Sequence, residues 1–380
     1  MIHSIRRLVP LSPFQREALA AALPPWLVAR AVVLGALFLA HYIVSHTHPG
    51  AAGVALRTHQ GLLGWDAGYY RDIAHMGYAP LGHDALRFFP LVPILARALK
   101  DITGISVSFT LLVVSNLSAL GVGLGLYGLV RAEGFGRDMA RRVAWLVALV
   151  PPAFVLVMGY ADATFMLLAI VAFFGYRRGR WGLAAIMGIL AGLCRPVAIV
   201  LVLPAAFEAW RGWRSCPRRQ RLGRLGAVLG PVVGIGLYLG WVQWRFSDGL
   251  APIREQTANN LRGGLANPFL TFGHDLRGML HHHIGSGLHV PWFVLCVVLM
   301  VVCFRRLPAC YGLFVAGMLA LAASSSNLDS FERYALSAFP LLIGAVSLTA
   351  GERMERSVLA LATAGMAGYS VLAFLNAYVP

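Results

Sequence analysis

The chain has 380 residues, of which 58% are hydrophobic and only 13% are charged, and its mean hydropathy is +0.69. Soluble domains contain about 45–50% apolar and about 25% charged residues, so this composition excludes a soluble globular protein. The formal net charge of +16 would suggest a nucleic-acid partner in a soluble protein. The positions of the arginines, described below, explain that charge without nucleic acid. The apolar runs are continuous rather than alternating, which favours membrane helices over a β-barrel.

Eleven apolar runs are predicted to cross the membrane as helices. A spanning helix needs about 20 mostly apolar residues, and fewer where neighbouring helices shelter it. The first run is preceded by arginines rather than by the apolar core of a signal peptide, so we expect an uncleaved anchor. We predict an all-α polytopic protein with one integral membrane domain over residues 1–380. The predicted spans are 26–45, 105–130, 143–158, 162–176, 181–193, 197–210, 225–246, 289–304, 311–326, 335–350 and 357–377.

The arginines alternate from one predicted turn to the next. With a cytoplasmic N-terminus, each inner turn holds at least two arginines and the short outer turns hold almost none, as the positive-inside rule predicts for an odd number of spans. We interpret the short, arginine-rich chain as bacterial and expect it in the inner (plasma) membrane. The inner arginines are Arg131, Arg137, Arg141 and Arg142, then Arg177, Arg178 and Arg180, the run from Arg211 to Arg224, Arg305 and Arg306, and Arg353 and Arg356.

Two predicted outer segments, 46–104 and 247–288, are too long to be simple turns. Loops of this length in compact proteins are usually functional or disordered. Their aromatic content favours ordered structure at the membrane interface. Within the first segment, Asp66 to His75 is predicted to form an amphipathic helix at the membrane surface.

The densest group of polar and aromatic residues begins at Trp65. On a helix, Asp66, Tyr69 and Tyr70 share one face, because they are spaced by three and four residues. A carboxylate beside aromatic rings suits a sugar, whose apolar faces stack on rings and whose hydroxyl groups donate to the acid. The alternative is a helix-capping aspartate in an interfacial aromatic belt.

Two further charged residues lie at tight outer turns. Asp162 lies where two apolar runs meet, and an ionisable residue within the membrane indicates function by default. The alternative is that Asp162 only caps a helix. Arg195 could pair with Asp162 or bind a phosphate through two hydrogen bonds. Glu332 and Arg333 lie at the outer end of the tenth run. We therefore predict one composite site at the outer interface.

Metal binding is not expected. The run His281 to His283 cannot chelate one ion from a helix face, because consecutive helical residues point about 100° apart. The five cysteines lie in or beside apolar runs without a CxxC pair, and we expect them to pack as small apolar residues. The acidic residues show no metal-binding spacing.

Several motifs follow one another in the order of a known family. They are Trp65-Asp66 with Ile73-Ala74 and Gly77-Tyr78, Phe88-Phe89-Pro90-Leu91 with Pro93, Tyr160-Ala161-Asp162 with Phe165, Arg195-Pro196, and Arg333-Tyr334 with Phe339-Pro340. Over nearly its whole length the sequence resembles the PIG-V type of polyprenyl-phosphate-mannose-dependent mannosyltransferases, within the GT-C glycosyltransferase superfamily.

This resemblance implies a GT-C-like bundle with interfacial helices and the active site in the first large outer loop. It also implies an acidic catalytic base, which maps to Asp66. The family usually has Glu at the position of Asp162 and a Trp near the position of Leu261. Its eukaryotic members act in GPI-anchor assembly, and the acceptors of bacterial members vary, so the acceptor is left open.

The expected reaction moves mannose, or a similar hexose, from a polyprenyl-phosphate sugar to an extracytoplasmic glycolipid, glycan or protein. A lipid phosphate is a good leaving group, so one carboxylate base and cations for the phosphate are sufficient. Direct displacement implies inversion, giving an α-linkage from a β-linked donor. No separate cofactor and no nucleic acid are expected, and membrane lipid surrounds the protein. The expected roles are base for Asp66, phosphate binding for Arg195, Arg333 and Arg71, stacking for Trp65, Tyr69 and Tyr70, and substrate contact for Asp162 and Glu332.

Two other functions remain open on the sequence. A transporter or lipid flippase could use Asp162 and Arg195 as intramembrane charges. Against it, no pair of Gly- or Pro-broken spans recurs in the two halves of the sequence. A non-catalytic membrane subunit of the same fold is the third possibility, given the departures from the family at Asp162 and near Leu261.

Overall fold

The described part of the chain is helical throughout. The computed structural model describes all residues except 1–11, 48–51, 215, 259–262, 283 and 350. Within the described residues, one isolated bridge between Leu265 and Ser325 is the sole β-type pairing. This confirms the prediction of an all-α membrane protein at the level of secondary structure.

The helices follow one another along the chain with short connections. In chain order they are α1 (Pro13–Thr47), α2 (Ala52–Gln60), η1 (Gly61–Leu63), α3 (Asp66–Met76), η2 (Ala79–Leu81), η3 (His83–Arg87), α4 (Leu91–Thr103), α5 (Val107–Ala132), α6 (Arg137–Leu149), η4 (Pro151–Leu156), α7 (Asp162–Arg177), α8 (Trp181–Cys194), η5 (Pro196–Leu201), α9 (Val202–Trp210), α10 (Arg218–Phe246), α11 (Ala251–Gln256), α12 (Pro268–Leu280), α13 (Ile284–Arg306), α14 (Ala309–Ala323), α15 (Phe331–Ser337), α16 (Pro340–Leu348) and α17 (Glu352–Phe374).

Five of the described helices are long and apolar enough to cross a membrane: α1, α5, α10, α13 and α17. A sixth crossing exists if α15 and α16, which are bent by 85° at their junction, count as one span. Each of the eleven predicted runs contains a helix or two consecutive helices. However, helices such as α7, with 16 residues, are about 24 Å long, shorter than the ~30 Å hydrocarbon core. The eleven crossings therefore stay a prediction.

Prolines account for the broken helices. Pro151, Pro196 and Pro340 begin η4, η5 and α16, respectively. Proline cannot donate a backbone hydrogen bond and pushes the preceding residue towards an extended conformation. Accordingly, Val150 has ψ 142° and Arg195 has ψ 144°, whereas Phe339 before Pro340 keeps a helical ψ of −28°. The sequence predicted continuous spans over 143–158 and 335–350, so the breaks at Pro151 and Pro340 were not predicted. The break at Pro196 coincides with the predicted turn between 193 and 197 and places Arg195 at the end of α8.

Arg30 stabilises irregular backbone inside the bundle. Its Nε donates to Asn116 Oδ1 at 2.8 Å, and its Nη2 donates to the carbonyl oxygen of Leu156 in η4 at 3.3 Å. Irregular backbone at membrane depth needs such internal partners, because lipid supplies none. Arg30 lies at the inner end of the first predicted span, where an arginine side chain often extends to the membrane surface. In the structure the Arg30 side chain instead contacts protein.

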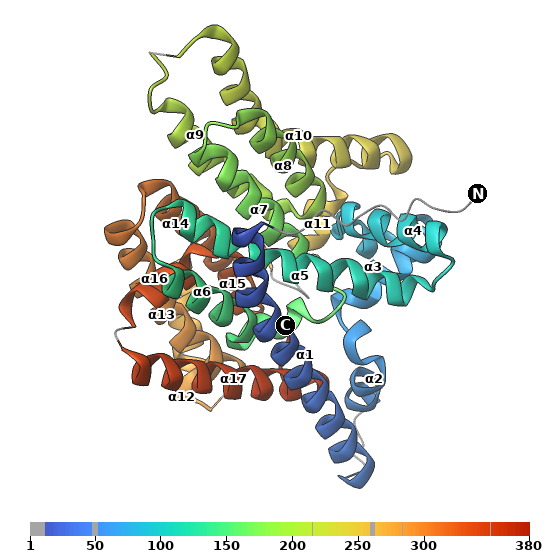
Figure 1. The fold of residues 1–380 in the computed structure, drawn as a ribbon. Helices are drawn as coiled ribbons and strands as arrows, with labels where there is room; N and C mark the ends of the chain where they lie inside the picture. Colours follow the sequence, from blue (N-terminus) through green and yellow to red (C-terminus); the bar gives the residue numbers. More distant parts are fainter. Residues whose placement is uncertain (1–11, 48–51, 215, 259–262, 283, 350) are drawn as a thin grey trace, which may run out of the picture.

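Helices α8 and α10 pack at close range and lie side by side in Figure 1. A Cβ atom at Gly192 of α8 would overlap the carbonyl oxygen of Pro231, and one at Gly234 of α10 would overlap that of Ile189. Each helix has a second glycine four residues earlier, so both carry the small-xxx-small spacing that lets membrane helices approach closely. This contact fixes the end of α8, from which Arg195 projects.

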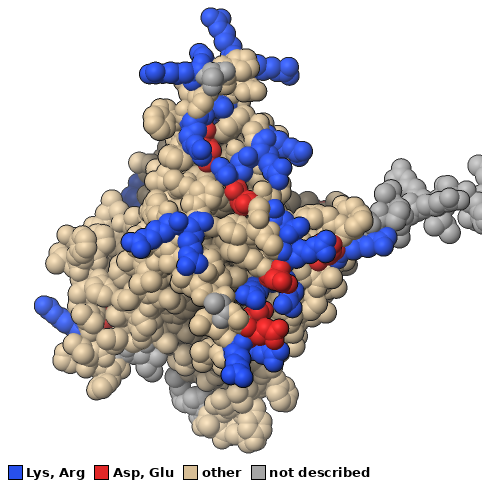
Figure 2. Space-filling model, turned by 60° about the vertical axis from the view of Figure 1, so that its left-hand side comes forward, with Lys and Arg blue, Asp and Glu red and all other residues tan. Residues whose placement is uncertain are grey.

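The arginines of the predicted inner turns lie together with acidic partners. Figure 2 shows Lys and Arg side chains gathered with Asp and Glu in a band over one face of the molecule. Arg142 pairs with Glu355 at 2.9 Å, which joins α6 to α17. Arg177 pairs with Glu133 at 2.7 Å and with Glu208 at 3.2 Å, which joins α7 to the end of α5 and to α9.

The two predicted outer segments contain short helices. The first, 46–104, holds α2, α3 and α4 with three short 3-10 turns between them, and α3 begins at Asp66 as expected for the amphipathic helix. The second, 247–288, holds α11 and α12 and the start of α13. Leu261, near which the family usually has a Trp, lies outside the described residues.

Candidate functional site

The backbone turns sharply just before Asp66. Trp65 precedes α3 with φ 58° and ψ −131°, a conformation that costs a non-glycine residue of the order of 1–3 kcal/mol unless its surroundings hold it. The indole is held on two sides, because its Nε1 donates to the carbonyl oxygen of Ala373 at 3.1 Å and the Arg57 guanidinium lies 4.1 Å above the ring. Asp66 is then the first residue of α3. No side-chain cap begins this helix, so the capping alternative does not describe Asp66.

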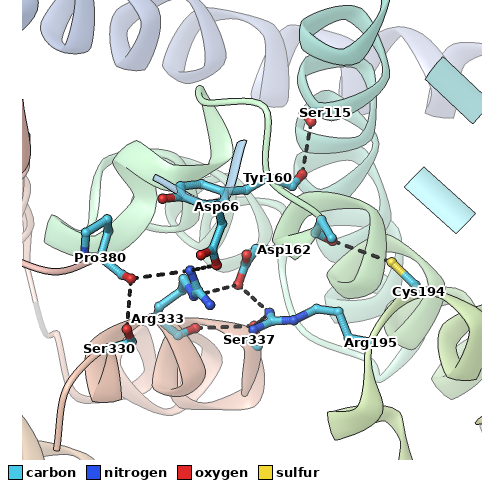
Figure 3. Close-up of polar contacts among 11 residues, drawn as sticks. Asp66, Ser115, Tyr160, Asp162, Cys194, Arg195, Ser330, Arg333, Ser337 and Pro380 are labelled. Carbon is cyan, nitrogen blue, oxygen red and sulfur yellow. Dashed lines mark hydrogen bonds and ion pairs between the residues drawn. The ribbon is translucent and has the colours of Figure 1, made fainter. Parts of the chain in front are cut away.

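Two aspartates and two arginines meet next to this turn. We call Asp66, Asp162, Arg195 and Arg333 the outer cluster (Figure 3). Arg333 Nη1 lies 2.6 Å from Asp66 Oδ2, and its Nε lies 3.7 Å from Asp162 Oδ1. Arg195 Nη1 donates to the same Asp162 Oδ1. The four residues come from α3, α7, the end of α8 and α15, so the cluster ties together four parts of the chain.

The Asp162–Arg195 pair forms the buried part of the outer cluster. The Asp162 side chain is 3% exposed and that of Arg195 is 6% exposed. Arg195 also donates to Ser337 Oγ at 3.3 Å, and its guanidinium lies 5.3 Å above the Tyr334 ring. A buried ion pair tolerates removal of neither partner, because the remaining charge would be left without compensation. Of the two roles expected for Arg195, the structure shows the pairing with Asp162.

A cavity of about 310 Å³ lies beside the outer cluster. Trp65, Asp66, Tyr70, Arg195 and Arg333 line it, so it contains five of the nine predicted site residues. Asp162 is not in the lining but contacts both cluster arginines. The Asp66 side chain remains 27% exposed. The cavity therefore combines an accessible carboxylate, cations and aromatic rings.

Tyr69 and Arg71 lie outside the lining of this cavity. The Tyr69 ring stacks on the Phe88 ring at a centroid distance of 4.6 Å, and of these two residues Phe88 lines the cavity. Arg71 Nε pairs with Asp72 Oδ1 at 2.8 Å, with both side chains about one third exposed. Arg71 follows Asp66 by five positions, which turns it about 140° away on a helix. The expected phosphate contact of Arg71 has no support in this geometry.

Glu332 also lies outside the cavity lining, although Arg333 is its neighbour. Adjacent helical residues point about 100° apart, so only one of them faces the cavity. Glu332 is fully buried, with His289 Nδ1 2.7 Å from its Oε1 and the Tyr378 hydroxyl donating to its Oε2 at 2.9 Å. Burial, with the nearby Glu332 carboxylate, raises the pKa of the Tyr378 hydroxyl well above its ordinary value and keeps the donor protonated. Glu332 therefore anchors α15 outside the cavity lining, and its expected substrate contact has no support in this geometry.

Several cavity residues were not predicted from the sequence. Arg87 stands directly before the Phe88-Phe89-Pro90 motif. The motif was recognised in the sequence, but no role was predicted for Arg87. Asp329 and Gln256 line the cavity from two other parts of the chain. A main-chain oxygen of Pro380 accepts hydrogen bonds from Ser330 at 2.8 Å and from Arg333 at 3.3 Å. The sequence does not indicate where a main-chain oxygen lies.

Among the described residues, no group of three or more His, Cys, Asp or Glu side chains is arranged to hold a metal ion. The expectation of a metal-independent site stays a prediction. His283, the last of the three consecutive histidines, lies outside the described residues. The five cysteines are unpaired and buried, in agreement with packing as small apolar residues.

Comparison of the sequence with protein-family models and with curated proteins finds no match. The resemblance to the PIG-V-type mannosyltransferases therefore stays an expectation based on motifs. The function has to be argued from the chemistry of the cavity.

Proposed function

We propose that this chain is a membrane glycosyltransferase of GT-C type. It moves mannose, or a similar hexose, from a polyprenyl-phosphate sugar to an extracytoplasmic glycolipid, glycan or protein. The observation that carries the proposal is the accessible Asp66 carboxylate in a cavity that it shares with arginines and aromatic rings. The proposed sidedness rests on the arginine pattern of the sequence.

Asp66 suits the role of general base. Arg333 binds one carboxylate oxygen, Oδ2, and the described residues give Oδ1 no hydrogen-bond partner. Oδ1 can then take the proton of an acceptor hydroxyl as that oxygen bonds to the anomeric carbon. The bond from the anomeric carbon to the phosphate oxygen breaks, and the polyprenyl phosphate leaves with the electron pair. Attack opposite the leaving group inverts the anomeric centre.

The cluster arginines hold the base in position. Arg333 bridges Asp66 and Asp162, and Arg195 fixes Asp162 from the other side. A base held by buried partners needs no reorganisation when the reaction begins, which is the advantage of a preorganised site. The positive charges of Arg195 and Arg333 are thus largely compensated by these aspartates, and the first role of the two arginines is to position Asp66. Trp65, Tyr70 and Phe88 give the cavity an aromatic lining for the sugar.

The proposal is tested with purified protein in lipid nanodiscs, a radiolabelled polyprenyl-phosphate mannose and a total glycolipid and glycan extract as acceptor. We expect wild-type protein to move the label into the acceptor fraction. Asp66→Asn removes the proton acceptor, so we expect transfer to fall by roughly 10²–10⁴-fold. Asp72→Asn is the matched control, because Asp72 lies on the same helix but pairs with Arg71 outside the cavity.

Equal transfer by Asp66→Asn and wild type would overturn the proposal. Transfer by the purified chain alone would exclude the interpretation as a non-catalytic subunit. Mass spectrometry of envelope glycans and glycolipids, with and without this protein, then identifies the acceptor as the species that loses a hexose.

One observation favours a transporter as the second candidate. The charged residues of the outer cluster lie at helix breaks, including the end of α8 and the short α15 that bends by 85° into α16. Discontinuous helices that meet at a charged site are a feature of many transporters. The sequence predicted a turn at the end of α8 but not the bend between α15 and α16. Vesicles that contain the protein and accumulate an unmodified sugar or sugar lipid, without transfer of the label, would favour this function over the transferase.

A further inference from the structure

The three arginines that line the cavity differ in how their charges are compensated. Arg195 pairs with Asp162, and Arg333 pairs with Asp66 and approaches Asp162. These two arginines and two aspartates compensate one another. Arg87 forms no ion pair and no hydrogen bond with the described residues. It is the cavity arginine whose positive charge has no carboxylate partner.

Aromatic rings hold Arg87 without neutralising it. Its guanidinium lies 4.9 Å from the centre of the Phe88 ring and 5.2 Å from that of the Tyr69 ring. Cation–π contacts of this kind orient a guanidinium and leave its five N–H donors available. The Phe88 ring is itself fixed, because it stacks on Tyr69 and meets the edge of Tyr70 at 5.2 Å.

The backbone on both sides of Arg87 is held by tyrosine hydroxyls. Tyr238 donates to the carbonyl oxygen of Leu86 at 2.8 Å, and Tyr78 donates to that of Phe88 at 2.7 Å. Leu86 is fully buried and Phe88 is nearly so. Arg87 therefore stands on rigid backbone with a partly exposed head group at the cavity, which is how a preorganised binding residue is built.

We infer that Arg87 binds the phosphate of the lipid-linked sugar donor. This inference rests on the proposed function, and it replaces the expected phosphate contact of Arg71. The planar guanidinium fork matches two phosphate oxygens. When the sugar leaves, the phosphate changes from a singly charged diester to a monoester with more negative charge. A cation that no carboxylate neutralises stabilises this developing charge more than one already paired with an aspartate.

The experiment measures equilibrium binding of radiolabelled farnesyl phosphate and farnesol to the full chain in nanodiscs. We expect Arg87→Gln to weaken farnesyl phosphate binding by roughly 10- to 100-fold, the usual effect of losing charged hydrogen bonds. Farnesol binding stays unchanged, which also shows that the variant is folded. Arg87→Lys keeps the charge but loses the fork, so its affinity lies between those of wild type and Arg87→Gln.

Arg97→Gln serves as the matched control, because Arg97 is an exposed arginine on α4 that does not line this cavity. We expect it to bind farnesyl phosphate as wild type does. Wild-type affinity in Arg87→Gln, or an equal loss in Arg97→Gln, would overturn the inference. Inorganic phosphate that competes as well as farnesyl phosphate would also overturn it, since the site would then recognise phosphate without lipid.

The transfer assay on the same preparations separates the two proposals. If the wild-type protein transfers the label and Arg87→Gln binds farnesyl phosphate as tightly as wild type, the role of Arg87 is refuted and the transferase proposal stands. No transfer by wild type, together with weakened farnesyl phosphate binding by Arg87→Gln, would refute the transferase and support a lipid-phosphate site at Arg87.

Discussion

Two groups of arginines and carboxylates occupy different parts of this molecule and differ in what surrounds them. The outer cluster of Asp66, Asp162, Arg195 and Arg333 lines or adjoins a cavity of about 310 Å³. We call Glu133, Arg177 and Glu208 the inner cluster, because they lie in, or within a few residues of, turns predicted on the cytoplasmic side. No residue of the inner cluster lines that cavity.

The inner cluster has the geometry of a structural clamp. Arg177 contacts both oxygens of Glu133, at 2.7 and 2.9 Å, and its remaining nitrogen reaches Glu208 at 3.2 Å. The Tyr311 hydroxyl donates to Glu133 at 2.9 Å, so α14 joins the group. Each carboxylate is nearly buried and faces protein.

Composition alone therefore does not distinguish a reactive group from a clamp. Both clusters contain arginine bound to carboxylates. The outer cluster differs in that Asp66 has one oxygen bound and the other unbound, beside a cavity large enough for a sugar. Accessible, incompletely bound acids near cavities are the ones available for proton transfer.

The largest difference in stability is expected at Asp162. Asp162→Ala leaves Arg195 buried without its carboxylate, so we expect the free energy of unfolding to fall by about 3–5 kcal/mol. Transfer activity should fall as well, because Arg333 loses one of its two anchors. Unfolding in mixed detergent micelles measures the first effect. Asp162→Glu keeps the charge and is the residue usual in the resembling family, so a loss equal to that of Asp162→Ala would contradict the ion-pair explanation.

The inner cluster should affect stability without affecting activity. Glu133→Gln removes one charge partner of Arg177 but leaves Glu208, so we expect a loss of about 1.5–3 kcal/mol in unfolding free energy. Transfer per folded molecule should stay at the wild-type value. A decrease in transfer comparable to that of Asp66→Asn would show that the two clusters are not functionally distinct.

The contact of α8 with α10 should be sensitive to a single methyl group. Gly234→Ala places a Cβ against the carbonyl oxygen of Ile189, so we expect a loss of about 1–3 kcal/mol from overpacking. Gly240→Ala on the same helix meets no atom within 4 Å and should stabilise the protein by up to about 1 kcal/mol through helix propensity. Thermal unfolding of both variants measures the difference. If both substitutions changed the stability in the same direction, the close packing of α8 against α10 would be contradicted.

The smallest effect is expected at Trp65. Trp65→Phe keeps an aromatic ring but removes the hydrogen bond to the carbonyl oxygen of Ala373, so we expect a loss of about 0.5–1.5 kcal/mol. The turn before Asp66 should also loosen, and transfer should fall more than stability does. A variant with wild-type transfer and lowered stability would show that Trp65 supports the fold alone.

Hydropathy revealed the helical elements because it is a local property. All eleven predicted runs contain helices, and α3 begins at Asp66 as the amphipathic pattern indicated. The lengths were less predictable, because one proline lowers the mean hydropathy of an apolar run only slightly. The breaks at Pro151 and Pro340, which lie inside predicted spans, were therefore not predicted.

The site was only partly predictable for a geometric reason. Asp66 and Arg333 lie 267 positions apart, and their pairing depends on how the whole bundle packs. Which of Glu332 and Arg333 faces the cavity depends on the rotation of the short helix α15 about its axis. The sequence around these two residues does not reveal that rotation. Arg87 was overlooked because the sequence cannot show which arginines lack acidic partners.

The separation of Asp66 and Arg333 along the chain also determines when the site can exist during synthesis. Arg195 follows Asp162 by only 33 residues, so that pair can form while the ribosome is still synthesising the middle of the chain. Arg333 follows Asp66 by 267 residues, which at about 5–20 residues per second corresponds to roughly 15–50 seconds. During that interval Asp66 has no arginine to hold it. A partly inserted chain therefore cannot assemble the outer cluster, and the proposed transfer activity would begin only after α15 has joined the bundle.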